Sequence, residues 1–196
     1  MGSRPRASAE AVRPPTIRFA RRAEDIESVR SLFREYRQWH LDHRRSSGLS
    51  PAVLRTGLSY LDAEIASLPG EFAPPRGALI LAREDGHPVG CGALRPWDRD
   101  VGEIKRVYVR STSRGHGVGL RIARALLAAA HDRRYERVVL DTLPSMAAAI
   151  RIYRRLGFVP TSAYWAHPVA NALYFEYRFR RPFSRPSRKS SGRSAA

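Results

Sequence analysis

Cysteine is almost absent from this chain, since Cys91 is the single thiol in 196 residues. One thiol cannot form an internal disulfide, which fits a protein of a reducing compartment. Long apolar runs are also missing, and no stretch approaches the roughly 20 residues that span a bilayer. The N-terminus lacks the hydrophobic core of a secretory signal peptide. These absences predict a cytoplasmic protein that makes no membrane contact.

Lysine is scarce too, with Lys105 and Lys189 the two examples among 35 basic residues, and the formal net charge is +17. Residues 178–196 hold seven basic groups and no acid. A coding bias toward arginine accounts for much of the excess, because no nucleic-acid-binding motif accompanies it. A weak, nonspecific contact with nucleic acid through this basic tail is left open.

Composition divides the chain into one domain and two tails. Residues 1–15 are rich in proline, alanine, arginine and serine, and residues 181–196 are rich in arginine and serine, so both are predicted to be disordered. Hydrophobic residues make up 43% of the whole chain, which is enough for a globular core. Residues 16–180 are therefore predicted to form a single domain.

Apolar spacing and turn residues predict the order β-α-α-β-β-β-α-β-α-β-β. The predicted helices cover residues 23–43, 50–68, 118–130 and 146–156. The predicted strands cover residues 16–20, 77–83, 88–94, 103–109, 137–141, 158–159 and 173–179. Asp85-Gly86 joins two apolar runs, as in a tight hairpin. The strand–helix–strand order over residues 103–141 predicts a parallel crossover.

Glycine recurs at every second position in residues 114–119, which read Arg-Gly-His-Gly-Val-Gly and directly precede the third helix. Such a loop exposes backbone N–H groups at a helix N-terminus, where the helix dipole also favours negative charge. We interpret it as a phosphate cradle rather than a simple tight turn. A dinucleotide site fits less well, because Leu120 stands where G-x-G-x-x-G needs its third glycine and residues 110–114 separate strand from loop.

Three motifs in residues 16–179 resemble the GNAT superfamily of acyl-CoA-dependent N-acyltransferases. Residues 114–119 match its pyrophosphate motif [QR]-x-x-G-x-[GA], residues 149–158 match its A-x-x-x-Y-x-x-x-G-F helix end, and residues 103–109 match the strand between substrate and cofactor. The resemblance implies an α/β (α+β) fold. It would contain a mixed sheet, with an antiparallel N-terminal meander and a splayed parallel pair, flanked by about four helices.

By this resemblance, acetyl-CoA is the acyl donor and no metal takes part. The pyrophosphate would be bound by Arg114, Gly115, His116, Gly117, Val118 and Gly119. The pantetheine arm would pair with the strand at Val107, Tyr108 and Val109, like an added strand. The N–H of Val107 would stabilise the oxyanion that forms during acyl transfer.

Two residues are candidates for proton transfer. Tyr153 is the expected general acid for the departing thiolate, because the family commonly places this hydroxyl near the sulfur; a purely packed aromatic ring is the alternative. Glu103 is the expected base for the acceptor amine, directly or through water. An ion pair with Lys105 or Arg106 is the equally weighted alternative for Glu103.

Several further residues are less strongly indicated. Asp141 and Thr142 are expected to shape the acceptor pocket, or to serve in a cap or loop, and Met146 stands where many relatives have Asn. Two aromatic groups could line the acceptor side, although packing is favoured for each: Trp39, His40 and His43, and Tyr164, Trp165 and His167. His40 and His43 have no cysteine or carboxylate cluster beside them that would suggest a metal.

These expectations together predict an N-acetyltransferase that acts on a primary amine by direct transfer in a ternary complex. The acceptor is a small molecule or a peptide, and a homodimer is left open. The alternative is a catalytically idle acyl-CoA-binding module with the same fold.

Overall fold

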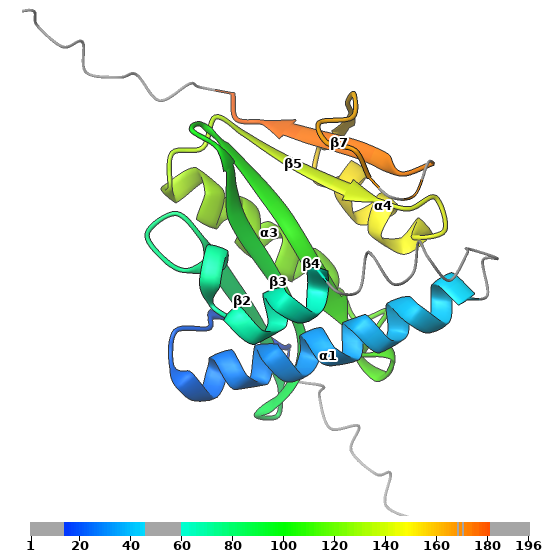
Figure 1. Cartoon of the computed structure of the whole chain (residues 1–196). Coiled ribbons are helices and arrows are strands. Elements are labelled where there is room, and N and C mark those ends of the chain that lie inside the picture. The colour runs from blue at the N-terminus through cyan, green and yellow to red at the C-terminus, as the bar shows by residue number, and fades with distance from the viewer. Residues whose placement is uncertain (1–13, 46–59, 168, 170, 181–196) are drawn as a thin grey trace, which may run out of the picture.

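A seven-stranded sheet of order β1-β2-β3-β4-β5-β7-β6 runs through the molecule (Figure 1). The computed structural model describes residues 14–45, 60–167, 169 and 171–180. Residues 1–13 of the predicted N-terminal tail (residues 1–15), the predicted tail at residues 181–196, and the predicted start of the second helix at residues 50–51 lie outside the described residues.

The helices and strands follow the predicted order. The strands are β1 (Thr16–Phe19), β2 (Ala78–Glu84), β3 (His87–Asp98), β4 (Val101–Val109), β5 (Arg137–Thr142), β6 (Val159–Pro160) and β7 (Leu173–Arg178). The helices are α1 (Ala23–Arg45), α3 (Val118–Asp132) and α4 (Ala147–Arg155), with residues 60–67 also helical and short 3-10 turns at Gly70–Phe72 and Ser111–Ser113. No helix among the described residues has the length and apolar composition needed to cross a membrane.

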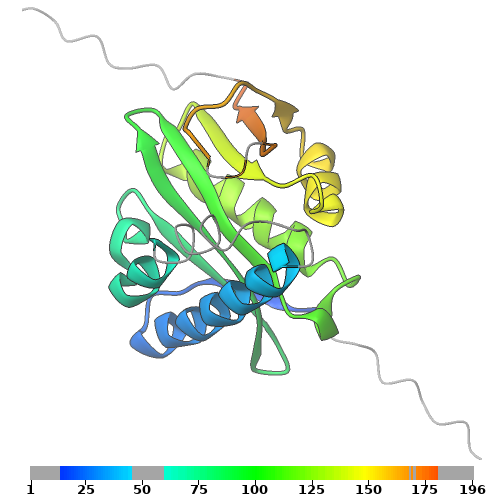
Figure 2. The same cartoon turned by 45° about the vertical axis from the view of Figure 1, so that its right-hand side comes forward.

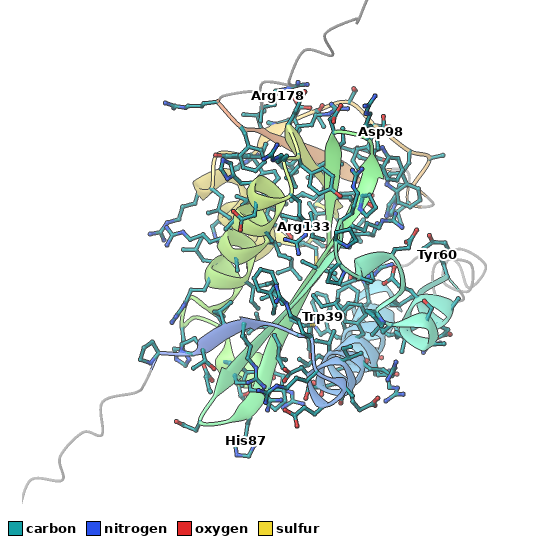
Figure 3. The ribbon with its side chains drawn as sticks, turned by 90° about the vertical axis from the view of Figure 1, so that its left-hand side faces the viewer. Trp39, Tyr60, His87, Asp98, Arg133 and Arg178 are labelled. Atoms are coloured by element: carbon teal, nitrogen blue, oxygen red, sulfur yellow. The ribbon has the colours of Figure 1, made fainter. Side chains whose placement is uncertain are left out.

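The predicted mixed sheet is confirmed. Strands β1 to β4 form an antiparallel meander, β4 and β5 are parallel, and β7 is antiparallel to β5. Asp85 and Gly86 both have positive φ at the tip of the β2–β3 hairpin, as a type I′ turn requires. Figure 3 shows His87 beside this tip and Asp98 near the opposite end of the long strands.

Two hydrophobic cores lie on opposite faces of the sheet. Alternation along β2 sends Ile80 to the core beneath α3 and α4, and sends Leu79 and Leu81 to the core beneath α1 and residues 60–67. Figure 2 shows these helices on the two sides of the strands. Burying each such side chain contributes roughly 1.5–3 kcal/mol, so both faces help to hold the central strands in place.

The parallel pair is short. Strand β4 pairs with β5 only through Val101–Glu103 and Arg137–Val139, and beyond these residues the strands diverge (Figure 1). The predicted splay is therefore present. On its other side, β4 contains a bulge: β3 pairs Cys91 with Tyr108 and Ala93 with Lys105, so Gly92 faces both residues 106 and 107.

Strands β3 and β4 are longer than predicted at the hairpin that joins them. The sequence predicts strands ending at residue 94 and restarting at 103, whereas the ladder continues through Arg95↔Glu103 and Pro96↔Gly102. Proline and charged residues in this segment suggest a loop. A buried ion pair between Arg95 and Glu103 holds the two strands together there, which local patterning does not reveal.

Candidate active site

A cavity of about 780 Å³ lies where β4 and β5 diverge. The walls come from several parts of the chain: α1, residues 104–109 of β4, residues 113–120, the end of β5 with the segment that follows it, helix α4, and His167. Because β4 and β5 no longer bond to each other at this level, their facing edges are open to a ligand. The cavity is thus built by the divergence of two strands.

The glycine loop forms one end of the cavity. Gly115 and Gly117 have φ of +85° and +77°, and a Cβ built on either residue meets no atom within 4 Å. Gly117 is also the N-cap of α3, and no side chain of the described residues caps that helix end. The first-turn N–H groups of α3 therefore lack intrahelical acceptors. This end can hold an anionic group such as a phosphate.

Helix α1 covers the cavity near this loop. Tyr36, Trp39 and His40 line the cavity from one face of the helix. The guanidinium of Arg114 lies 5.3 Å from the centre of the Trp39 ring, and Arg114 Nε donates to the Val109 carbonyl at 2.9 Å. Figure 3 shows Trp39 between α1 and the strands. These contacts hold the arginine of the loop beside the cavity wall.

Tyr153 reaches the cavity from α4. Its side chain is buried, with its ring 5.7 Å from that of Phe158. Burial raises the pKa of the Tyr153 hydroxyl, and the nearby Tyr36 and Asp141 raise it further. The hydroxyl therefore stays protonated at neutral pH and can donate a proton or a hydrogen bond into the cavity.

Glu103 is fully buried at the point where β4 and β5 part. Its side chain is 0% exposed and accepts hydrogen bonds from Arg95 Nε at 2.6 Å, Tyr164 OH at 2.9 Å and Lys105 Nζ at 3.2 Å. It does not belong to the cavity lining. Glu103 therefore reaches the cavity only through its neighbours.

Asp141 lies on β5, two residues beyond Val139, which pairs with Glu103, and its side chain is 17% exposed. Lys105 Nζ and Tyr164 OH bridge the two carboxylates, reaching Asp141 Oδ1 at 3.5 and 3.3 Å, and His167 Nε2 lies 3.5 Å from Oδ2. Burial alone would raise the pKa of Asp141, but Lys105, His167 and Arg106 lower it overall. Asp141 is thus an ionised carboxylate on the cavity wall.

Most residues expected to bind the cofactor line this one cavity. They are Val107, Tyr108, Val109, Arg114, Gly115, Gly117, Val118 and Gly119, together with Tyr153. His116 is exposed and lies outside the lining. The bridging role of Tyr164 was not predicted, because its partner Glu103 is 61 residues away in sequence. Met146 also lines the cavity, just before α4.

The remaining aromatic candidates fall into different places. Trp39, His40 and His167 line the cavity, whereas the side chain of His43 lies outside the described residues. Trp165 packs 4.9 Å from His167, and Lys105 Nζ lies 5.4 Å from its ring. In the part of the chain that the structure describes, no three His, Cys, Asp or Glu side chains gather as a metal site would require.

A family model and the related proteins found by comparison point to the same family, as follows. The model of the Acetyltransferase (GNAT) family matches residues 27–158. An uncharacterized N-acetyltransferase of Dictyostelium discoideum is 36% identical, with 81% of this chain and 96% of the relative covered. Another of Schizosaccharomyces pombe is 34% identical over 58% of this chain and 71% of the relative.

A solved structure shares the fold. PaiA N-acetyltransferase from Thermoplasma acidophilum, in complex with coenzyme A, superposes with a TM-score of 0.65. The alignment covers 85% of this chain and all of that chain, at 13% identity. At this identity the likeness concerns the fold.

The buried network around Glu103 generates a stability prediction. We expect Glu103→Ala to lower the free energy of unfolding by roughly 3 kcal/mol, because it removes a shared acceptor from the buried Arg95 and from Lys105 and Tyr164, even though Arg95 keeps its pair with Glu71. Urea denaturation would measure the change. Glu27→Ala is the matched control, since Glu27 pairs with Arg30 on the surface and its loss should change little. Equal effects of the two substitutions would contradict the prediction.

Proposed function

The chain belongs to the GNAT family of acetyltransferases, and on that premise we propose that it transfers an acetyl group from acetyl-CoA to a primary amine. Both substrates would be bound together, and the transfer would be direct. One observation carries the proposal: the glycine loop, the open edges of β4 and β5 and the Tyr153 side chain all face one cavity.

The donor end of the cavity fits coenzyme A. Its pyrophosphate would bind the N–H groups of residues 114–119 at the start of α3, where the space beside Gly115 and Gly117 is open. The pantetheine arm would run along β4 and bond to the backbone at Val107–Val109. The coenzyme A held by the PaiA enzyme, which has this fold, supports this assignment.

Three groups would serve the chemistry. The N–H of Val107, at the bulge of β4, would stabilise the negative charge that develops on the acyl oxygen. Tyr153 would give its proton to the departing thiolate. The ammonium of the acceptor would first release a proton to water, which frees its lone pair for attack. Glu103 does not line the cavity, so it would favour this proton loss only through Lys105 and Tyr164.

Binding of the donor gives the first test of the proposal. Acetyl-CoA should raise the unfolding temperature in a concentration-dependent way, and NAD should not, because a ligand of the native state stabilises it by mass action.

Gly117→Ala should cost about 1 kcal/mol of stability, since it places a side chain at positive φ, and should also weaken acetyl-CoA binding. Gly86→Ala has the same backbone strain at the distant β2–β3 hairpin, so it should lose stability and keep its affinity. In the unsubstituted protein, a rise in unfolding temperature with NAD and none with acetyl-CoA would refute the proposal.

Turnover separates an enzyme from an idle acyl-CoA-binding module. We expect release of free coenzyme A thiol when acetyl-CoA is mixed with members of a panel of amines, amino acids, polyamines, aminoglycosides and peptides. A thiol reagent can follow the reaction because Cys91, the single thiol of the chain, is buried. Acetyl-CoA binding without release by any amine in the panel would favour the idle module.

The role of Tyr153 gives the next prediction. Tyr153→Phe should lower kcat by about 10²-fold or more, as expected for loss of a general acid, while the dissociation constant for coenzyme A changes little. Tyr177→Phe is a matched control, since Tyr177 packs against Phe158 outside the cavity lining. Equal kcat values for Tyr153→Phe and the unsubstituted protein would remove the acid role.

A further inference from the structure

Asp141 is the only carboxylate among the described residues that line the cavity. Other charged groups on the described lining are cationic and include Lys105, Arg106 and Arg114. Arg106 Nε lies 2.7 Å from Oε1 of Glu64, which belongs to the helical residues 60–67. A cationic ligand entering the end of the cavity near β5 would therefore meet one anionic group, the Asp141 carboxylate.

The two neighbouring carboxylates are held differently. Glu103 accepts a short, charged hydrogen bond from Arg95 at 2.6 Å, and its side chain is wholly buried. The contacts of Asp141 with Lys105, Tyr164 and His167 are all 3.3 Å or longer, beyond the usual 2.7–3.2 Å of a good hydrogen bond. Asp141 thus keeps capacity to accept short bonds from a ligand.

The Asp141 carboxylate and the proposed acid, Tyr153, line the same cavity. The charge of Asp141 is one of the causes that raise the pKa of the Tyr153 hydroxyl, after burial and Tyr36. The acceptor nitrogen must approach the same acyl group whose thiolate Tyr153 would protonate. An ammonium held by Asp141 would therefore lie in the cavity where the acyl transfer is proposed to occur.

We propose that Asp141 binds the ammonium group of the acceptor, and that Glu103 is a positioning residue. This inference rests on the proposed function and deepens it. The Lys105 ammonium donates to Glu103 as well as to Asp141. Its positive charge is therefore shared between two carboxylates, and Asp141 keeps part of its negative charge for a ligand. The acceptor class is then an aliphatic primary amine, which carries a positive charge at neutral pH, rather than an arylamine, which does not.

A pair of coenzyme A analogues tests this inference without knowledge of the natural acceptor. S-(2-aminoethyl)-coenzyme A carries an ammonium close to the sulfur, and S-propyl-coenzyme A has the same shape without the charge. By isothermal titration calorimetry at pH 7, the protein should bind the aminoethyl analogue about tenfold or more tightly, because hydrogen bonds to charged groups are worth roughly 1.5–3 kcal/mol.

Substitution of Asp141 should abolish this preference. Asp141→Asn is expected to bind both analogues equally and to keep the affinity for S-propyl-coenzyme A. The control is Glu176→Gln on β7, whose carboxylate pairs with Arg137 and Arg178 and lies outside the lining; it should keep the full preference. A preference that survives Asp141→Asn would overturn the assignment. Failure of the unsubstituted protein to bind either analogue would instead refute the proposed function, and this inference with it.

The positioning role of Glu103 needs a separate readout. Glu103→Gln should reduce the preference, because Lys105 would then pair with Asp141 alone, and the double variant Glu103→Gln with Lys105→Met should restore it. Lys105→Met by itself should increase the preference, which provides a test that leaves the Arg95–Glu103 pair intact. Unchanged preference in Lys105→Met, or no recovery in the double variant, would show that Glu103 does not act on Asp141 through Lys105.

Discussion

The early end of the parallel pairing between β4 and β5 is the constraint on which the site depends. Three residues of each strand bond to each other, and the next residues on both strands leave their facing backbone groups open toward a cavity. Open sheet edges of this kind are costly to bury without partners. A ligand that presents an extended polar chain can satisfy them, so the divergence both creates the cavity and selects what enters it.

Charged side chains connect the two strands at the point of divergence, in addition to the apolar packing of the sheet. Glu103 is the last β4 residue paired with β5, and Asp141 lies two residues beyond its partner Val139. Lys105, two residues after Glu103, projects from the same face of β4 and contacts both carboxylates. One ammonium and the Tyr164 hydroxyl thus connect the strands just after their backbones part. Such a connection fixes the opening of the cavity and places an ionised group on its wall.

The fold and the donor end of the site could be predicted from sequence because their determinants are local. Positive φ at Gly117 and the position of Tyr153 on α4 are properties of short segments. The contacts of the Glu103 side chain could not be predicted from local sequence. They depend on the pairing of Arg95 with Glu103 across a hairpin and on the return of residue 164 to the same point, and a periodic pattern along one strand carries no information about either.

This difference explains why membership of the family identifies the donor and leaves the acceptor open. In the proposed function, backbone N–H groups and strand edges bind the donor, and any sequence that keeps glycine and the strand divergence can supply them. Recognition of the acceptor would instead depend on lining side chains such as Asp141 at the end of β5, His167, and Trp39 on α1. The placement of Asp141, the only carboxylate among the described residues of the lining, is therefore the feature of this chain from which the chemistry of its acceptor is best inferred.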